Sequence, residues 1–207
     1  RDGTGDYLEF GKALHKYVEL IVTNQLNDEA KDLLLLPRWV KQRYMIIQMA
    51  EKVKEAVEQR GLTFIMSELW MSHVYEDKDI TLEWTMDLLF ADKDGNYIII
   101  DIKTAKSNWT EEHAQAVKQK IIYPTLFKKR FNKIIKRFEY RVLTKTTNPE
   151  LYQFWEDVPE DIEEQVTKVL DELNRANETQ IREPNYPNYS CYYCPLKDKC
   201  KEYKAIV

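Results

Sequence analysis

Two acidic residues and one lysine, close to the ends of two apolar strands, carry the clearest chemical signal in this sequence. The stretch IIIDIKTAK at 98–106 is typical of a strand, and Asp101 and Lys103 are two residues apart, so both point to the same face. The run at 80–91 also has strand character and contains Asp87, and the intervening DKDG at 92–95 is a strong hairpin turn signal. Pairing through that turn predicts that Asp87 and Asp101 converge beside Lys103.

Two carboxylates this close repel each other and raise each other's pKa unless a cation lies between them. A hard divalent ion such as Mg²⁺ or Mn²⁺, bound by carboxylate oxygens, a backbone carbonyl and water, suits such a place. It lowers the pKa of a water molecule and neutralises charge on a phosphate under attack. Lys103 could hold or deprotonate that water, or stabilise developing charge. The alternative for an Asp–Lys pair taken alone is a surface ion pair of little energetic value.

The composition indicates one folded domain. The chain has 207 residues, of which 43% are hydrophobic, with five Trp and thirteen Tyr. The longest apolar runs, LLLL at 33–36 and YIII at 97–100, are too short to cross a bilayer, so we expect no membrane partner. The three cysteines lie close together near the C-terminus, a spacing typical of a metal or cluster site rather than a secreted disulfide framework. We therefore expect a cytoplasmic protein.

The charge is unevenly distributed, although the net charge is only −4. Residues 114–138 contain eight basic residues and no acidic one, whereas residues 150–178 contain ten acidic residues and two basic ones. A local basic face is an electrostatic footprint for phosphate, whatever the total charge. The alternative is a solvated helix face. The candidates for contacts with a DNA backbone are Lys118, Lys120, Lys128, Lys129 and Arg130.

Hydrophobic periodicity predicts the order of the elements. Helices are expected at about 7–26 and 39–59, followed by strands at 63–72, 80–91 and 97–103. A long helix from 110 to about 136 is expected to bend at Pro124, because proline lacks the backbone donor and clashes with the preceding turn. A strand at 138–144 and a helix at 160–176 complete the order. This pattern predicts an α/β domain with a small mixed sheet flanked by helices.

At these positions the sequence resembles a known family. Asp87 followed by Asp101-Ile102-Lys103-Thr104 is similar to the core of the PD-(D/E)XK nucleases, specifically the RecB-like exonuclease branch. A Gly-x-x-x-His pattern upstream ends at His15, and a Gln-x-x-x-Tyr pattern downstream is formed by Gln119 and Tyr123. Each motif is weak alone, but together they span residues 10–200 in the family's order. The resemblance implies a restriction-endonuclease-like core.

The resemblance also implies roles for individual residues. His15, Asp87 and Asp101 would bind Mg²⁺ or Mn²⁺ together with the backbone carbonyl of Ile102, and Lys103 would be the catalytic lysine. Gln119 and Tyr123, one helical turn apart, would orient the substrate phosphate or the attacking water. Glu68, on the strand before Asp87, is a further acid that we expect near the metal.

The cysteine segment resembles that of family members with an iron–sulfur cluster, such as the AddB-type helicase-nucleases and the CRISPR adaptation nucleases. Cys191, Cys194 and Cys200 have the C-x₂-C-x₅-C spacing. The nuclease domain would cover residues 1–180, with a Cys-rich segment at 181–207 packed on it. Those nucleases use four cysteines, so either the fourth precedes Arg1, or a [4Fe–4S] cluster has another ligand, or the segment binds Zn²⁺ or nothing.

One further position departs from the family. Trp84 stands where the family usually has a glycine, three residues before the first metal-binding Asp. Because a glycine there permits close approach of backbone or substrate, this departure concerns the path of DNA and not the metal site.

The expected function is a metal-dependent DNA nuclease. The resemblance points to an exonuclease on linear or single-stranded DNA, serving recombination, repair or phage-type DNA processing, with a helicase or recombination protein as a possible partner. A second hypothesis is a non-catalytic DNA-binding or assembly module that retains the fold. RNA as substrate is a third, because attack on its phosphate is similar.

Overall fold

The computed structural model describes residues 4–28, 43–106 and 109–179 of the chain. Cys191, Cys194, Cys200 and the predicted segment at 181–207 lie outside these residues. The chain divides into a compact unit over residues 1–166 and a second unit that starts at Thr167. Among the described residues, no helix combines the length and the apolar character that a membrane span needs.

A five-stranded sheet with helices around it forms the first unit, as the sequence predicted. In chain order its elements are α1 (Thr4–Val22), α3 (Arg43–Gln59), β1 (Thr63–Tyr75), β2 (Ile80–Ala91), β3 (Tyr97–Ala105), α4 (Glu111–Ala116), α5 (Gln119–Phe131), β4 (Ile135–Thr144) and β5 (Leu151–Asp157). The last described helix, α6 (Ile162–Thr179), begins in this unit and continues into the second. The strand order is β1-β2-β3-β4-β5. Only β3 and β4 are parallel, because α4 and α5 form the crossover between them, and the sheet is therefore mixed.

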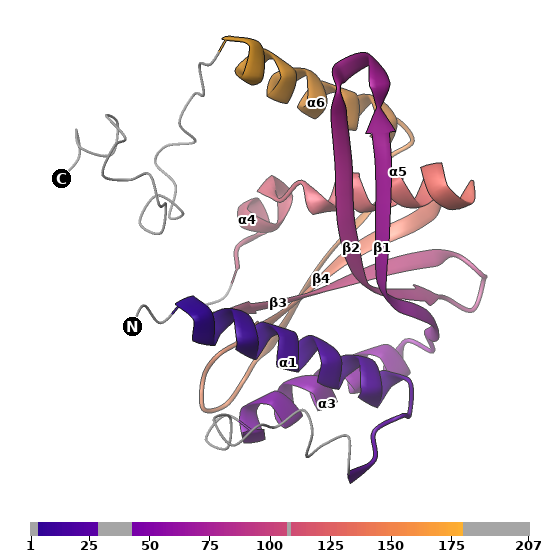
Figure 1. The fold of residues 1–207 in the computed structure, drawn as a ribbon. Coiled ribbons are helices and arrows are strands. Elements are labelled where there is room, and N and C mark those ends of the chain that lie inside the picture. Colours follow the sequence, from indigo (N-terminus) through magenta and orange to yellow (C-terminus); the bar gives the residue numbers. More distant parts are fainter. Residues whose placement is uncertain (1–3, 29–42, 107–108, 180–207) are drawn as a thin grey trace, which may run out of the picture. The chain divides into compact units, whose positions relative to one another are not determined.

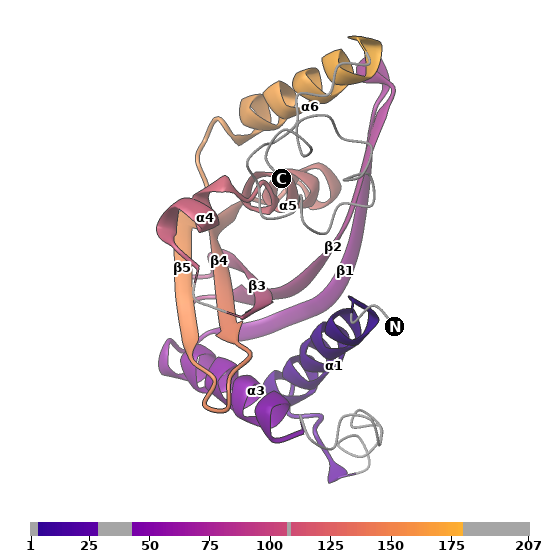
Figure 2. The ribbon, with the colours of Figure 1, turned by 90° about the vertical axis from the view of Figure 1, so that its left-hand side faces the viewer.

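The alternation of side chains along β3 builds a core on each face of the sheet. Ile98, Ile100 and Ile102 join one buried cluster with residues of α1 and α3. The opposite face meets α5, where the Tyr123 ring lies 5.7 Å from that of Phe138. Both ribbon views show α1 and α3 side by side on one side of the sheet and α5 on the other (Figures 1 and 2). The end of β3 thus lies between α1 and α5.

Strands β2 and β3 separate where the candidate acids lie. Gly95, with φ +80°, donates its N–H to the carbonyl of Asp92 at 3.0 Å and closes the predicted DKDG turn. From this turn the two strands pair as far as Leu88 and Ile100. Beyond that pair, β2 stays with β1 in a long hairpin, which we call the β1–β2 arm (residues 69–86; Figure 1). Asp87 and Asp101 are the first residues after the fork.

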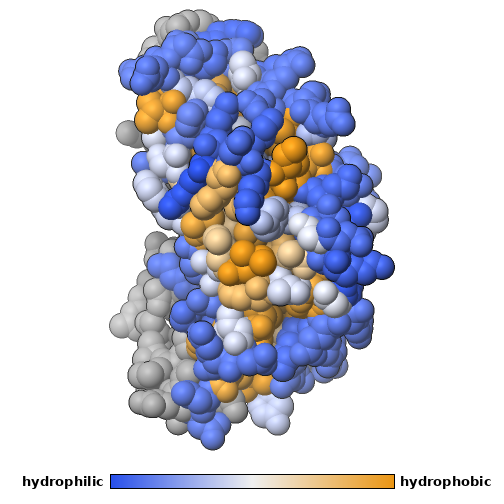
Figure 3. All heavy atoms as spheres, turned by 90° about the vertical axis from the view of Figure 1, so that its right-hand side faces the viewer, coloured by the Kyte–Doolittle hydropathy of each residue, from blue (hydrophilic) through white to orange (hydrophobic). Residues whose placement is uncertain are grey.

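Apolar side chains are exposed along the edges of the sheet. Ile65, Trp70 and Val74 are exposed on the edge strand β1. One face of the molecule shows apolar side chains in a band with hydrophilic side chains on both sides (Figure 3). Arg130 of α5 donates a hydrogen bond to the backbone carbonyl of Trp70. A charged side chain therefore covers part of the backbone edge of β1, which is one way in which proteins protect edge strands.

The single helix predicted from 110 to 136 is two helices, so that part of the prediction was wrong. The break lies at Val117, whose ψ of 123° is extended, whereas Pro124 sits inside α5. The second helix ends at Phe131 because Asn132 is left-handed and its N–H bonds to the carbonyl of Lys128 at 2.9 Å. Strand β5 was not predicted. It is an edge strand with one solvent-exposed face, and its acidic residues weaken the apolar pattern by which a strand is identified in the sequence.

Candidate active site

The fork between β2 and β3 brings Asp87 and Asp101 to one edge. Beyond the last paired residues, the Oδ2 atom of Asp87 accepts a hydrogen bond from the backbone N–H of Ile102 at 2.8 Å. A side chain thus replaces the backbone partner that β3 loses when β2 departs. The strand alternation and the turn, read from the sequence, were sufficient to place these two acids together.

His15 reaches this edge from α1. Its Nε2 atom lies 2.9 Å from the carbonyl oxygen of Ile102, and its Nδ1 atom lies 3.4 Å from Oδ1 of Asp87. Burial alone would lower the pKa of His15, but the hydrogen bond and charge of Asp87, with the charges of Asp101 and Glu68, raise it. The carboxylates therefore favour the protonated, cationic form of the imidazole. A bound metal cation would neutralise the same carboxylates.

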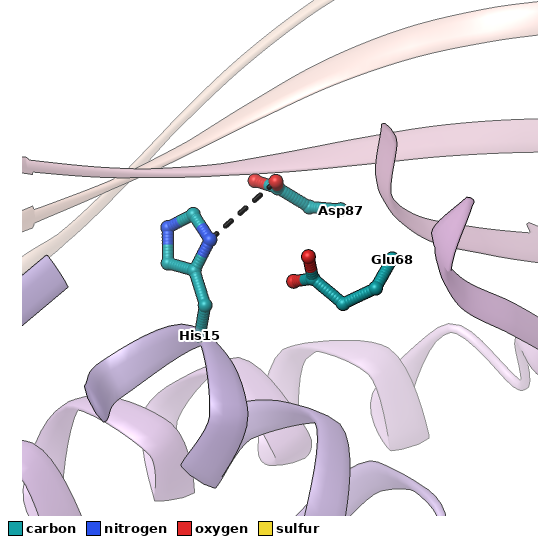
Figure 4. A group of neighbouring side chains, drawn as sticks. All are labelled: His15, Glu68 and Asp87. Atoms are coloured by element: carbon teal, nitrogen blue, oxygen red, sulfur yellow. Dashed lines mark ion pairs between the residues drawn. The ribbon is translucent and has the colours of Figure 1, made fainter. Parts of the chain in front are cut away.

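Glu68 is the third member of this group. Single ligand atoms of His15, Glu68 and Asp87 all lie within 4.8 Å of one another. The three side chains come from α1, β1 and β2 and point toward a common space (Figure 4). Burial and then the charge of Asp87 raise the pKa of the Glu68 carboxyl. One imidazole and two carboxylates suit Mn²⁺ or Mg²⁺.

The backbone of Glu68 is left-handed, with φ +48°. Such a conformation costs a non-glycine residue roughly 1–2 kcal/mol, and strain of this kind concentrates at functional sites. We expect Glu68→Gly to stabilise the metal-free protein by up to about 1 kcal/mol, since it removes both the strain and a carboxylate near Asp87.

The same change should weaken Mn²⁺ binding. Urea unfolding with a chelator and Mn²⁺ titration of the folded protein would measure the two effects separately. Glu68→Gln, which keeps a side chain at this position, is the matched control. A Glu68→Gly protein that binds Mn²⁺ as well as the wild type would exclude Glu68 as a ligand.

Asp101 has the most unusual surroundings in the site. Its side chain is fully buried, and neither carboxylate oxygen accepts a hydrogen bond from the described part of the chain. Lys103 Nζ lies 2.6 Å from Oδ2 and forms an ion pair with it. Burial, followed by the charge of Asp87, raises the pKa of Asp101 to about 7, and Lys103 opposes this rise. Buried oxygens with unfilled bonding capacity fit a divalent cation.

Gln119 and Tyr123 of α5 are hydrogen-bonded to each other, with Gln119 Nε2 2.7 Å from the Tyr123 hydroxyl. Burial and then the charges of Asp101 and Asp87 raise the pKa of Tyr123, so this hydroxyl keeps its proton. Trp84 also hydrogen-bonds the hydroxyl, and its ring lies 5.7 Å from that of Tyr123. The charges of the two carboxylates therefore act on the pair on α5, and Trp84 contacts Tyr123.

The predicted basic surface is largely occupied by the acidic segment that follows it. Lys120 lies 2.7 Å from Glu156, and Lys128 and Lys129 lie 2.6 and 2.7 Å from Glu163. These two lysines hold the pKa of Glu163 at about 2. Lys118 alone of the five candidates has neither an ion pair nor a backbone contact of this kind among the described residues. Phosphate would have to compete with these acids for the basic side chains.

Comparison with known proteins agrees with this geometry. A family profile described as the PD-(D/E)XK nuclease superfamily matches residues 2–201. Among solved structures, the chain is similar to SSO0001, with 14% identity, a TM-score of 0.50 and coverage of 94% of this chain and 85% of that one. It is also similar to a candidate exonuclease from Eubacterium rectale, with 11% identity, a TM-score of 0.51 and coverage of 87% and 72%. At such low identity these two structures support the fold alone. A search of curated proteins found no match.

Proposed function

Because this chain belongs to the PD-(D/E)XK nuclease superfamily, we propose that it is a metal-dependent deoxyribonuclease that hydrolyses phosphodiester bonds as an exonuclease on linear or single-stranded DNA. The observation that carries the proposal is the fully buried Asp101 carboxylate, which is paired with Lys103 at 2.6 Å while the charge of Asp87 acts against its ionisation. A protein that only bound DNA would have no use for like charges that are costly to bury. This argues against a non-catalytic assembly module.

The metal would be held by His15, Asp87 and Asp101 with the carbonyl of Ile102, and Glu68 adds a carboxylate at the same place. A divalent ion bound there would supply Lewis-acid chemistry and lower the pKa of water. The protein's own groups bind and orient the substrate.

Lys103 balances the charge of Asp101 and stabilises negative charge on the phosphate under attack. The Tyr123 hydroxyl and the Gln119 amide remain hydrogen-bond donors that can orient the phosphate or the water.

The proposal extends to the pathway in which the nuclease acts and to its cysteine segment. Digestion of DNA ends would serve recombination, repair or phage-type DNA processing in the cytoplasm, alongside a helicase or recombination protein. Cys191, Cys194 and Cys200 would hold a [4Fe–4S] cluster or Zn²⁺.

The test is a cleavage assay in which linear and closed circular DNA, each single- and double-stranded, are incubated with Mn²⁺, Mg²⁺ or a chelator. A Lys103→Ala protein purified in the same way controls for contaminating nucleases. We expect metal-dependent loss of linear DNA and protection of closed circles. Cleavage of circles would instead identify an endonuclease, and RNA in a parallel assay would reveal the alternative substrate. DNA binding without cleavage under every condition would contradict the proposal.

A further inference from the structure

A continuous row of aromatic rings passes beside the two carboxylates. Successive centroids are 5.7 Å apart from Trp84 to Tyr123, 5.7 Å from Tyr123 to Phe138, and 4.9 Å from Phe138 to Tyr140. Trp109 lies 5.4 Å from Tyr140, and His113 is stacked on Trp109 at 4.3 Å with an interplanar angle of 8°. We call these six residues the aromatic row. It connects the β1–β2 arm with α4 through α5 and β4.

The row adjoins the candidate active site along its middle part. Tyr140 is the β4 residue in register with Asp101 on β3. Burial, followed by the charge of Asp101, raises the pKa of both Tyr123 and Tyr140, so both hydroxyls keep their protons. The middle rings of Tyr123, Phe138 and Tyr140 are buried and serve as core. Only the ends of the row are accessible from solvent.

Each end presents an aromatic surface. The Trp84 side chain is 37% exposed and stands three residues before Asp87, where the arm leaves the sheet. At the other end His113 is exposed and covers one face of Trp109. Exposed rings on both sides of a phosphodiester-cleaving centre are placed to meet the bases next to the scissile phosphate.

The ion pairs of the basic residues make base–aromatic stacking more important for the affinity for nucleic acid. Four of the five predicted DNA-contacting residues already bond to Glu156, Glu163 or the Trp70 carbonyl. Contacts to phosphate release counterions and dominate affinity where basic side chains are available. Here phosphate contacts would have to replace these surface ion pairs, so their net gain is reduced and base stacking would add to it. Base–aromatic stacking contributes about 1–3 kcal/mol per base and tolerates any sequence.

Resting on the proposed nuclease function, we propose that the site selects single-stranded nucleic acid, and that the bases flanking the scissile phosphate stack on Trp84 and on the Trp109–His113 pair. In a duplex both faces of every internal base are covered by its neighbours, so a base reaches these rings only in a single strand or a frayed end. Trp84, at the position where the family usually has a glycine, is thus a specificity-determining residue.

Trp70 provides a matched control on the same arm. It pairs with Thr85, and the neighbouring pair on the arm is Met71 with Trp84, so Trp70 and Trp84 lie on opposite faces. At 54% exposed, Trp70 is more accessible than Trp84. If binding of single strands depended only on exposed apolar surface on the arm, Trp84→Ala and Trp70→Ala would weaken it equally. If a base stacks on Trp84, only Trp84→Ala would weaken it.

The test measures equilibrium binding by fluorescence anisotropy in a Lys103→Ala background with Mn²⁺, so that no cleavage is needed. The probes are a labelled single strand, the same strand with abasic sugars, and the duplex. We expect each stacked base to contribute about 5- to 150-fold, so intact single strands should bind more tightly than abasic ones by at least one such factor. Trp84→Ala should lose about one such factor, Trp84→Phe should keep most of it, and Trp70→Ala should leave the ratio unchanged.

Equal binding of intact and abasic strands by the protein with Trp84 intact would overturn the inference, and this comparison does not depend on whether Trp84→Ala folds. Equal losses in Trp84→Ala and Trp70→Ala would overturn it too. If wild-type protein cleaves DNA but shows no preference for intact bases, only this inference fails. If no nucleic acid binds or is cleaved, the proposed nuclease function fails as well.

Discussion

Replacement of Lys103 by alanine should reduce DNA cleavage by about 10²–10⁴-fold and leave the fold intact. The Lys103 side chain is partly exposed, and its Nζ atom is the nearest cation to the buried Asp101 carboxylate, at 2.6 Å. Without it, the charge that develops on the phosphate loses a preorganised partner. The pKa of Asp101 should also rise further, because Lys103 is the largest influence that lowers it. Initial rates at saturating DNA and Mn²⁺ measure the effect.

Two further variants make this prediction specific. Lys16→Ala removes an exposed lysine from α1, next to His15 in sequence, whose ion-pair partner among the described residues is Glu19, and should change the rate far less than Lys103→Ala. Lys103→Arg separates two roles, because arginine keeps the charge but does not give up a proton near neutral pH. Partial activity in Lys103→Arg would indicate charge stabilisation, and none would indicate proton transfer. Wild-type rates in Lys103→Ala would refute the catalytic assignment.

Replacement of Asp101 by asparagine should abolish metal-dependent cleavage and yet stabilise the metal-free protein at alkaline pH. The pKa of Asp101 rises from 3.8 to about 7 on folding, chiefly because of burial. Between these two values the folded state binds a proton that the unfolded state does not bind. Stability therefore falls as the pH rises through this window, and the loss is complete above the folded-state pKa. Asparagine carries no charge and avoids this loss.

Urea unfolding with a chelator, at about pH 5 and about pH 8, tests this effect. The stability of Asp101→Asn relative to wild type should increase by about 3 kcal/mol between the two pH values, given 1.36 kcal/mol per pKa unit. Mn²⁺ at about 100 times its dissociation constant should then stabilise the wild type by about 2.7 kcal/mol and the variant much less. A pH-independent difference between the two proteins would mean that Asp101 is not charged and buried as described.

The sequence by itself determined the pair of acids and the lysine. Alternation along a strand places Asp101 and Lys103 on one face, and the DKDG turn sets the register that brings Asp87 beside Asp101. Both are local rules, because a strand has a period of two and a tight turn fixes which residues face each other. The fold class followed from similarly local periodicities.

Other features were decided only by the tertiary structure. Glu68 was expected near the metal from the sequence, but its convergence with His15 and Asp87 to within 4.8 Å and its left-handed backbone were not, because no strand periodicity predicts either. The basic run seemed free to contact DNA until β5 and α6 brought Glu156 and Glu163 against it. Charges distant in sequence meet only after the chain has folded, so the pairing of charges, unlike the register of a hairpin, depends on packing across the whole domain.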